Sequence, residues 1–334
     1  MRITHDTLRK IAAHTASERS RYNRHLVSIY LTGSLLEEDA LLGGTADIDL
    51  IFIHDSQPPT GREILPVSDD IHVDIGHLPQ SLFLQPRSLR GEAWLGSFLC
   101  SNPTLLHDTQ HWFEFTQSVV CAQFTQPENV LNRARPLAEK ARQAWMTLHS
   151  DTRTSWPNTI ATYLSILKKS ANSIACLSGA PLTDRRFMLQ FPARAGFIGH
   201  PDLAETLAVL FCGQPLSDEE WSSWLAVCED CYAAIGKSGQ APARLHPARR
   251  NYYLKAAAAL WDSDHKSAAL WLLFHTWTDM INISTGDAAI QEWLGAARRL
   301  GLAQEDFAGR MEALDAYLDQ IEEALDVWAK DHGV

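Results

Sequence analysis

Short apolar runs fill the first hundred residues, and longer apolar stripes at helical spacing follow them. Residues 26–32 and 47–54 form two apolar runs, and apolar and polar side chains alternate in a third run at residues 70–77. Such short alternating runs are typical of β-strands. Residues 3–25 carry apolar side chains at helical spacing. The pattern therefore predicts a helix covering one side of a small sheet.

Turn and helix signals lie between these runs. Gly33-Ser34 follows the first run, and Glu37 stands three residues after Ser34, which is the capping-box pattern. We therefore expect a helix from Ser34 to about residue 42, ended by two glycines, and a loop at 57–61. A helix near 88–100 and a short strand such as 104–107 complete the expected sheet domain.

The pattern changes near residue 125, and the rest of the chain reads as helices. Candidate helices cover 127–149, 157–178, 184–190, 201–212, 217–236, 248–261, 264–282, 286–300 and 304–331. We expect an α+β fold in two domains. Residues 1–125 form a small mixed β-sheet with flanking helices, and residues 126–334 form an all-α helical bundle.

Acidic side chains share one face of two expected strands. Asp47 and Asp49 are two residues apart, and Asp70, His72 and Asp74 alternate along the next strand. Side chains two apart on a strand lie on the same face. Carboxylates gathered on one face repel each other, and a bound cation is the usual remedy. Taken singly, each could be a solvated or turn-capping carboxylate, but their conjunction favours a metal site.

Composition and charge narrow the class of protein. The 334 residues carry a formal net charge of −11, which argues against general nucleic-acid binding, since that depends on Lys and Arg. No apolar run approaches the roughly 20 residues that span a bilayer. The polar N-terminus does not have the pattern of a signal peptide. We therefore expect a cytoplasmic protein without membrane contact, whose six cysteines are reduced core thiols.

Three motifs together resemble the nucleotidyltransferase superfamily of the DNA polymerase β type. They are LTGS ending at Ser34, DIDL beginning at Asp47, and VDI around Asp74. A small α/β domain followed by helices is similar to aminoglycoside and minimal nucleotidyltransferases. The resemblance implies Asp47, Asp49 and Asp74 as catalytic residues and metal ligands, with two Mg²⁺ ions. It also implies that Gly33 and Ser34 bind the phosphates of ATP or another nucleoside triphosphate.

The resemblance further implies basic side chains from the helical half. Lys168 and Arg185 are the candidates for nucleotide binding, with Lys169 and Arg186 beside them, although each also fits a solvated helix face. The remaining motifs have plainer readings. His72 is expected as a sheet histidine that could order the site. The pair Cys228 and Cys231 is expected in a core, and aromatic residues including Tyr252, Tyr253 and Trp271 could line an acceptor pocket.

The function implied is transfer of a nucleoside monophosphate, expected to be AMP from ATP, to an acceptor hydroxyl with pyrophosphate release. The partners are the triphosphate and an acceptor that the sequence does not identify, the leading expectation being a small molecule such as an aminoglycoside. Two alternatives stay open. One is nucleotidylation of a protein or an RNA, and the other is a catalytically silent nucleotide-binding protein.

Overall fold

The computed structural model describes residues 3–37, 40–109, 111–150, 155–238, 241–283, 286–303 and 306–334. The chain forms two compact units. The first comprises Met1–Asn129 and Pro242–Ala256, and the second comprises Val130–Ala241 and Ala257–Val334. The segment Pro242–Ala256 thus packs with the sheet, although the sequence places it among the later helices. The expected domain bounds of 1–125 and 126–334 stay a prediction.

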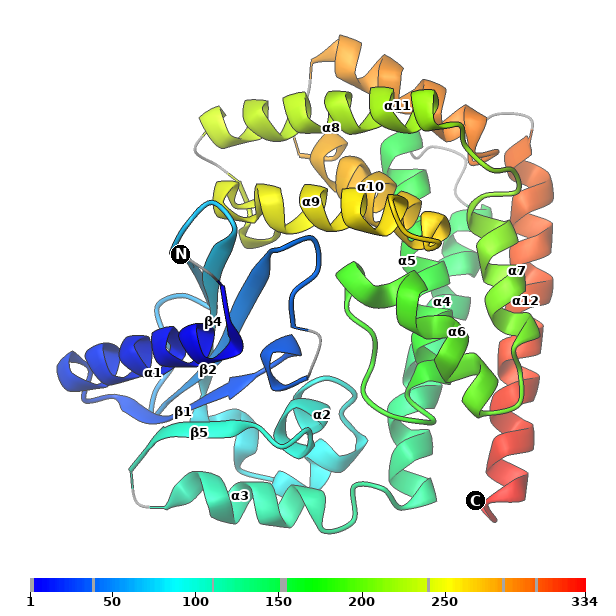
Figure 1. The fold of residues 1–334 in the computed structure, drawn as a ribbon. Helices are drawn as coiled ribbons and strands as arrows, with labels where there is room; N and C mark the ends of the chain where they lie inside the picture. Colours follow the sequence, from blue (N-terminus) through cyan, green and yellow to red (C-terminus); the bar gives the residue numbers. More distant parts are fainter. Residues whose placement is uncertain are drawn as a thin grey trace. The chain divides into compact units, whose positions relative to one another are not determined.

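A five-stranded mixed sheet forms the centre of the first unit (Figure 1). The strand order is β3-β4-β2-β1-β5. The strands are β1 Leu26–Thr32, β2 Ala46–His54, β3 Arg62–Pro66, β4 Ile71–Pro79 and β5 Thr104–Asp108. Only β2 and β4 pair in parallel; the other neighbours are antiparallel. The expected strands are present in an α+β fold, whereas β3 was not anticipated because its five residues show little alternation.

Apolar side chains cover both faces of this sheet. On one face, α1 (His5–Tyr22) packs Leu8 and Ala12 against Ile48, Leu50 and Val73. The other face packs against α2 (Leu95–Cys100), α3 (Trp112–Cys121) and the 3₁₀ turns Gln80–Phe83 and Pro86–Gly91. The helix expected near 88–100 is present as two shorter pieces, the 3₁₀ turn Pro86–Gly91 and the helix α2. The chain turns at Glu92, whose carboxylate accepts a hydrogen bond from the Leu95 backbone N–H at 2.5 Å.

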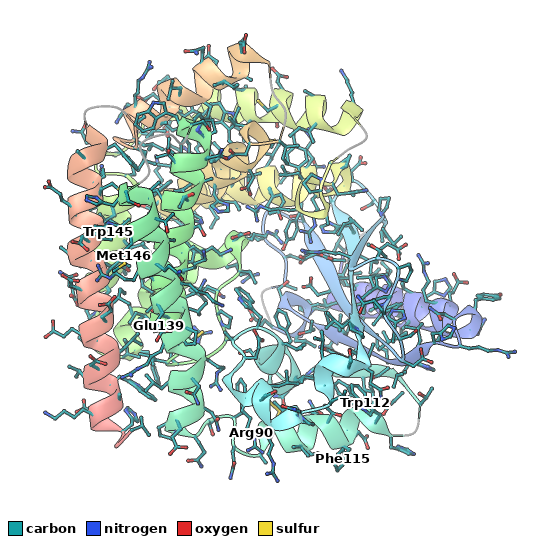
Figure 2. The ribbon with its side chains drawn as sticks, turned by 180° about the vertical axis from the view of Figure 1, so that it is seen from behind. Arg90, Trp112, Phe115, Glu139, Trp145 and Met146 are labelled. Atoms are coloured by element: carbon teal, nitrogen blue, oxygen red, sulfur yellow. A yellow bond between two sulfur atoms is a disulfide. The ribbon has the colours of Figure 1, made fainter. Side chains whose placement is uncertain are left out.

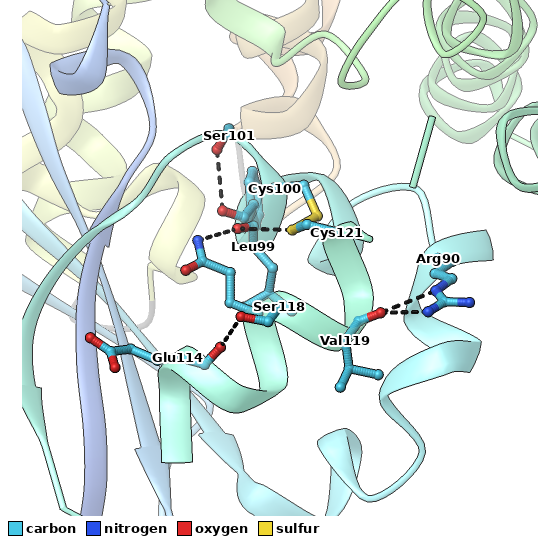
Figure 3. The surroundings of a disulfide bond; sticks show 10 residues. Arg90, Leu99, Cys100, Ser101, Glu114, Ser118, Val119 and Cys121 are labelled. Carbon is cyan, nitrogen blue, oxygen red and sulfur yellow. Dashed lines mark hydrogen bonds between the residues drawn. A yellow bond between two sulfur atoms is a disulfide. The ribbon is translucent and has the colours of Figure 1, made fainter. Parts of the chain in front are cut away.

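A disulfide joins α2 to α3, which corrects the expectation of six reduced thiols (Figure 3). Cys100 and Cys121 are bonded, while the other four cysteines form no disulfide. Arg90 braces the same region by donating to the Val119 carbonyl from Nε at 3.2 Å and from Nη2 at 2.6 Å. Composition alone gave no signal for this pair, because the two cysteines meet only after α2 and α3 have packed.

Removing this disulfide is expected to destabilise the first unit. The bonded cysteines are separated by 21 residues. Closing a loop of this length lowers the entropy of the unfolded chain, so Cys100→Ser with Cys121→Ser should cost about 3 kcal/mol. Urea unfolding with and without reductant measures the change. Reductant should destabilise the wild type and leave the double variant unaffected. A wild type that titrates as six free thiols would contradict the bond.

A buried histidine pair lies on the α1 face of the sheet, where β2 ends. His54 Nε2 and His77 Nδ1 are 2.9 Å apart, and His54 is 4% exposed. His77 Nε2 lies 3.5 Å from Glu63 Oε2. Burial lowers the pKa of both imidazoles below the ordinary value of 6.5, and each also lies near another cation or imidazole. Both rings are therefore neutral at pH 7.

The first unit should lose stability on mild acidification because of this pair. A histidine with a lowered folded-state pKa binds fewer protons in the folded than in the unfolded state. Its contribution is fully present above pH 6.5 and is lost as the pH falls below that value. Urea unfolding between pH 7.5 and 5 measures the slope. His54→Gln should flatten it, whereas His14→Gln, whose side chain is 73% exposed, should not. Equal slopes would contradict this origin.

The second unit is built of helices. They are α4 Pro127–Ser150, α5 Trp156–Ala175, α6 Phe187–Phe197, α7 Asp202–Phe211, α8 Asp218–Ser238, α10 Lys266–Ile281, α11 Asp287–Arg299 and α12 Asp306–Asp331, with the 3₁₀ turn Asp184–Arg186. Helix α9 (Arg250–Trp261) begins in the first unit and ends in the second. Within the described ranges, none of the helices has the length and apolarity to cross a membrane.

Large aromatic side chains form the core of these helices. Trp271, Trp277 and Trp293 are at most 1% exposed. Trp271 is thus a core residue, which removes it as a lining residue of an acceptor pocket. At the surface of α4, Arg142 pairs with three carboxylates of α12: Asp315, Asp319 and Glu322. Trp145, which lies on α4 (Figure 2), donates to the Met311 carbonyl at 3.1 Å. Cys228 and Cys231 are both buried in α8.

Candidate functional site

The carboxylates of the motifs, Asp47, Asp49 and Asp74, lie in the first halves of β2 and β4. Strands β2 and β4 are paired so that Asp47 lies opposite His72 and Asp49 opposite Asp74. Because side chains alternate along a strand, these four residues share the face turned away from α1. Ile48, between the two aspartates of β2, belongs to the core beneath α1. The sequence expectation of a shared acidic face is met by this register.

Asp47 is a buried carboxylate near the beginning of β2. It is 6% exposed, and among the described residues it makes no hydrogen bond or ion pair. One ligand atom each from Asp47, His72 and Asp74 lie within 4.8 Å of one another. Burying an unpaired carboxylate is unfavourable unless a counter-charge is near. Asp47 and its neighbours therefore fit a bound divalent cation, and carboxylate oxygens are the ligands that Mg²⁺ prefers.

Gly33 is required where it stands because Asp49 lies against it. Gly33 follows β1 with φ +80° and ψ −163°, a region open almost only to glycine. A Cβ built there would lie 2.8 Å from Asp49 Cγ and closer still to Oδ2. The glycine thus lets the backbone pass beside the Asp49 carboxylate. The structure thus brings Gly33 and Asp49 together.

Ser34 begins a single 3₁₀ turn, Ser34–Leu36, in place of the expected helix. Residues 38 and 39, within the expected helix, lie outside the described residues. The capping box is absent, because no side-chain hydrogen bond caps this turn and Gly33 occupies the N-cap position. The Ser34 Oγ is buried and has no hydrogen-bond partner among the described residues. The phosphate contact that the resemblance implied for Ser34 stays a prediction.

Two further hydroxyl groups stand on β1 beside the carboxylates. Thr32 pairs with Asp49 across the antiparallel strands, and Tyr30 pairs with Ile51. Thr32 is 2% exposed and Tyr30 is fully buried. Neither hydroxyl has a hydrogen-bond partner within the parts of the chain that are described. Neither residue stands out in the sequence, since a hydroxyl side chain within an apolar strand usually belongs to the core.

Asp74 is held by two arginines that the sequence analysis missed. Arg62 of β3 donates from Nε to Oδ1 at 2.7 Å and from Nη2 to Oδ2 at 2.5 Å. Arg249 donates from Nη2 to the same Oδ2. The Arg62 side chain is 47% exposed, whereas those of Arg249 and Asp74 are 5% and 4% exposed. Asp74 is therefore a neutralised carboxylate here, and its roles as metal ligand and proton acceptor stay predictions.

Arg249 comes from the segment Pro242–Ala256, which packs on the edge of the sheet. The 3₁₀ turns Ala243–Leu245 and Pro247–Arg249 contact β3, and the second also contacts β4. Asp70 accepts hydrogen bonds from Lys255 at 2.7 Å and Asn251 at 3.0 Å. The hydrogen bond from Lys255 lowers the pKa of Asp70. A Cβ on Gly43 would collide with the Lys255 backbone, so this glycine allows the segment to approach.

Aromatic rings of the same segment surround the Arg249 guanidinium. Its Nη1 donates to the Tyr253 hydroxyl at 3.2 Å, and the group lies 5.8 Å from the ring centroid of Tyr252. The Tyr252 ring in turn meets His72 edge-on at 5.1 Å. Tyr252 and Tyr253 are at most 9% exposed. These tyrosines therefore support the carboxylate face of the sheet; their suggested place in an acceptor pocket stays untested.

The basic candidates of the helical half belong to the second unit. Lys168 of α5 forms an ion pair with Asp184. Arg185, in the 3₁₀ turn Asp184–Arg186, is 4% exposed. Burial lowers the pKa of the neighbouring Lys169, and Lys140 adds to the effect. The structure brings Lys168 to a carboxylate within its own unit, and contact of Lys168 and Arg185 with a triphosphate stays a prediction.

Comparison with known proteins shows no family for this chain. No family model matches the sequence, and no curated protein matches it. Among solved structures, the chain is similar to a nucleotidyltransferase-like protein from Exiguobacterium sibiricum 255-15, with 11% identical residues and a TM-score of 0.35. The match covers 94% of this chain and 91% of the other. A structural similarity this low is not evidence of function. The proposed function is therefore based on the site itself.

Proposed function

We propose that this protein is a metal-dependent nucleotidyltransferase. The supporting observation is the buried carboxylate of Asp47, which has no partner among the described residues. It shares one face with Asp49 and Asp74, at the end of the sheet where Gly33-Ser34 follows β1. Such a face binds divalent cations, and the adjacent turn offers backbone and hydroxyl groups to phosphate oxygens. A metal-bound nucleoside triphosphate would place its metal on the carboxylate face and its phosphates against the Gly33-Ser34 turn.

The reaction is an in-line displacement at the α-phosphorus of the triphosphate. The acceptor oxygen forms the new P–O bond, the bond to the bridging oxygen breaks, and pyrophosphate leaves with its electron pair. Asp47 and Asp49 would hold two Mg²⁺ ions, which would supply charge neutralisation for the phosphate oxygens. Ser34 would donate its hydroxyl to a phosphate oxygen, and Asp74 is the proposed further ligand or acceptor of the hydroxyl proton.

The donor and acceptor are proposed on chemical grounds. AMP from ATP is the expected transferred group, with Lys168 and Arg185 contributing to triphosphate binding. The acceptor is expected to be a cationic small molecule of the aminoglycoside kind, since the chain carries a net charge of −11. Hydroxyls of a protein or an RNA are the alternative acceptors, and RNA is disfavoured by the same charge.

Transfer from labelled triphosphates to a panel of acceptors tests the proposal. The chain is incubated with Mg²⁺ or Mn²⁺, each of four α-labelled nucleotides, and aminoglycosides, a peptide library or short RNAs. Pyrophosphate release and labelled acceptor are measured. Asp47→Asn and Asp49→Asn should each lower the rate at least about a thousandfold. Asp69→Asn, an exposed carboxylate of the same unit, should leave it unchanged.

A silent nucleotide-binding protein is the second candidate, and one observation favours it. Both oxygens of Asp74 already accept hydrogen bonds from arginines, which weakens this carboxylate as a proton acceptor. Calorimetric titration with ATP and Mg²⁺ separates the candidates. Binding of ATP without pyrophosphate release in the presence of any acceptor tested would support the silent protein. No binding of any triphosphate would overturn both.

A further inference from the structure

We propose that His72 is a metal ligand of this site, so that the site binds Mn²⁺ and Co²⁺ in preference to Mg²⁺. The inference rests on the proposed metal-binding role of Asp47 and Asp74, and it goes beyond the three carboxylates expected from the motif. His72 is fully buried beside Asp47 on the adjoining parallel strand. Imidazole favours later divalent metals, whereas sites made only of carboxylates suit Mg²⁺.

The distances support a single ion among the three side chains. Their ligand atoms lie within 4.8 Å of one another. Side-chain atoms this close to one another can converge on a single cation after small side-chain rotations. Asp49, which lies opposite Asp74, is not part of this cluster. The Asp49 carboxylate lies against Gly33 instead.

A second observation points to a ligand at this position. Asp47 is more than nine-tenths buried, and within the described portion of the chain it has no hydrogen-bond or ion-pair partner. It shares its face with the other two members of the cluster. A buried carboxylate facing a second carboxylate and an imidazole is stabilised by a cation bound to all three.

The arginines on Asp74 leave room for such an ion. A carboxylate has about four lone-pair positions, and the two arginines use three of them. Arg62 is half exposed, so it can move into solvent when a cation binds, while the buried Arg249 stays on Oδ2. Tyr252 fixes the orientation of the His72 ring through their edge-on contact. Such support of a ligand ring sharpens metal affinity.

Metal titration of the full chain tests the proposal without measuring activity. Mn²⁺ is titrated by electron paramagnetic resonance, Co²⁺ by its visible absorption, and Mg²⁺ by competition. Wild type should bind Mn²⁺ and Co²⁺ at least about tenfold more tightly than Mg²⁺, and His72→Gln should remove that preference while retaining Mg²⁺ binding. His14→Gln, an exposed histidine of α1, is the matched control. Unchanged Mn²⁺ and Co²⁺ affinity in a folded His72→Gln would overturn the proposal.

A spectroscopic measurement on the wild type keeps the test decisive if His72→Gln does not fold. Electron spin-echo modulation from the bound Mn²⁺ should show an imidazole nitrogen, and its absence would overturn the proposal. Failure of the proposed function has a different signature. Histidine-dependent metal binding without any transfer would reject the nucleotidyltransferase alone, whereas transfer with a spectrum free of nitrogen coupling would reject only the His72 ligand.

Discussion

Arg249→Ala is expected to lower the free energy of unfolding of the first unit by about 3–5 kcal/mol, because it leaves the buried Asp74 carboxylate short of a counter-charge. Asp74 and Arg249 are 4% and 5% exposed in their side chains, so water cannot replace the lost interaction. The variant also loses the hydrogen bond to Tyr253. Urea unfolding, with hydrogen exchange of the β4 amides to assign the transition to the first unit, measures the change.

Arg62→Ala is the matched control, because it removes the other guanidinium from the same carboxylate. The Arg62 side chain is 47% exposed, so its loss should cost no more than about 1 kcal/mol. Adding Asp74→Asn to Arg249→Ala should recover part of the loss, since the unpaired charge then disappears. Equal and small effects of the two arginine substitutions would show that Arg249 does not support Asp74.

Gly33→Ala is expected to destabilise the site and to abolish the stabilisation that the proposed binding of nucleotide and metal would give. The backbone angles at Gly33 impose a strain of about 1–3 kcal/mol on any side chain. A Cβ at this position overlaps the Asp49 carboxylate, so the new methyl group also displaces that carboxylate. Thermal unfolding with and without ATP and Mg²⁺ measures both effects. The melting temperature should fall, and the ligand-induced rise should vanish.

Gly44→Ala separates backbone strain from the collision with Asp49. Gly44 also has a positive φ, of +71°, but a Cβ there meets no atom within 4 Å. This variant should show only a loss of about 1–2 kcal/mol, with the ligand-induced rise retained. A Gly33→Ala protein that keeps its full response to ATP and Mg²⁺ would remove Gly33 and Asp49 from the proposed site.

The carboxylate face was predictable because it depends on local rules. The period of two along β2 and β4 places Asp47 with Asp49 and His72 with Asp74, whatever the rest of the chain does. The α+β class followed from the change of period near residue 125. The capping-box pattern at Ser34 predicted a helix, but the structure has a short 3₁₀ turn there. Gly33, with its positive φ, occupies the N-cap position of this turn.

The partners of Asp74 were not predictable from the sequence. Arg249 lies 175 residues away from Asp74, and no local pattern marks one arginine of the run Arg249-Arg250 for burial. Arg62 was missed because β3 is short and no strand was predicted for residues 62–66. The disulfide was missed for a related reason. Cys100 and Cys121 meet only through the packing of α2 against α3.

The discontinuity of the first unit has a consequence for how the protein is made. During translation, the strands of the sheet leave the ribosome long before residues 242–256. Asp74 therefore stays without Arg249 while more than half of the chain is synthesised. Contacts between such distant residues form slowly, because closing a long loop is entropically unfavourable. The carboxylate face is therefore completed late in biosynthesis. A nascent chain stopped after the sheet would carry the motif without its buried counter-ion.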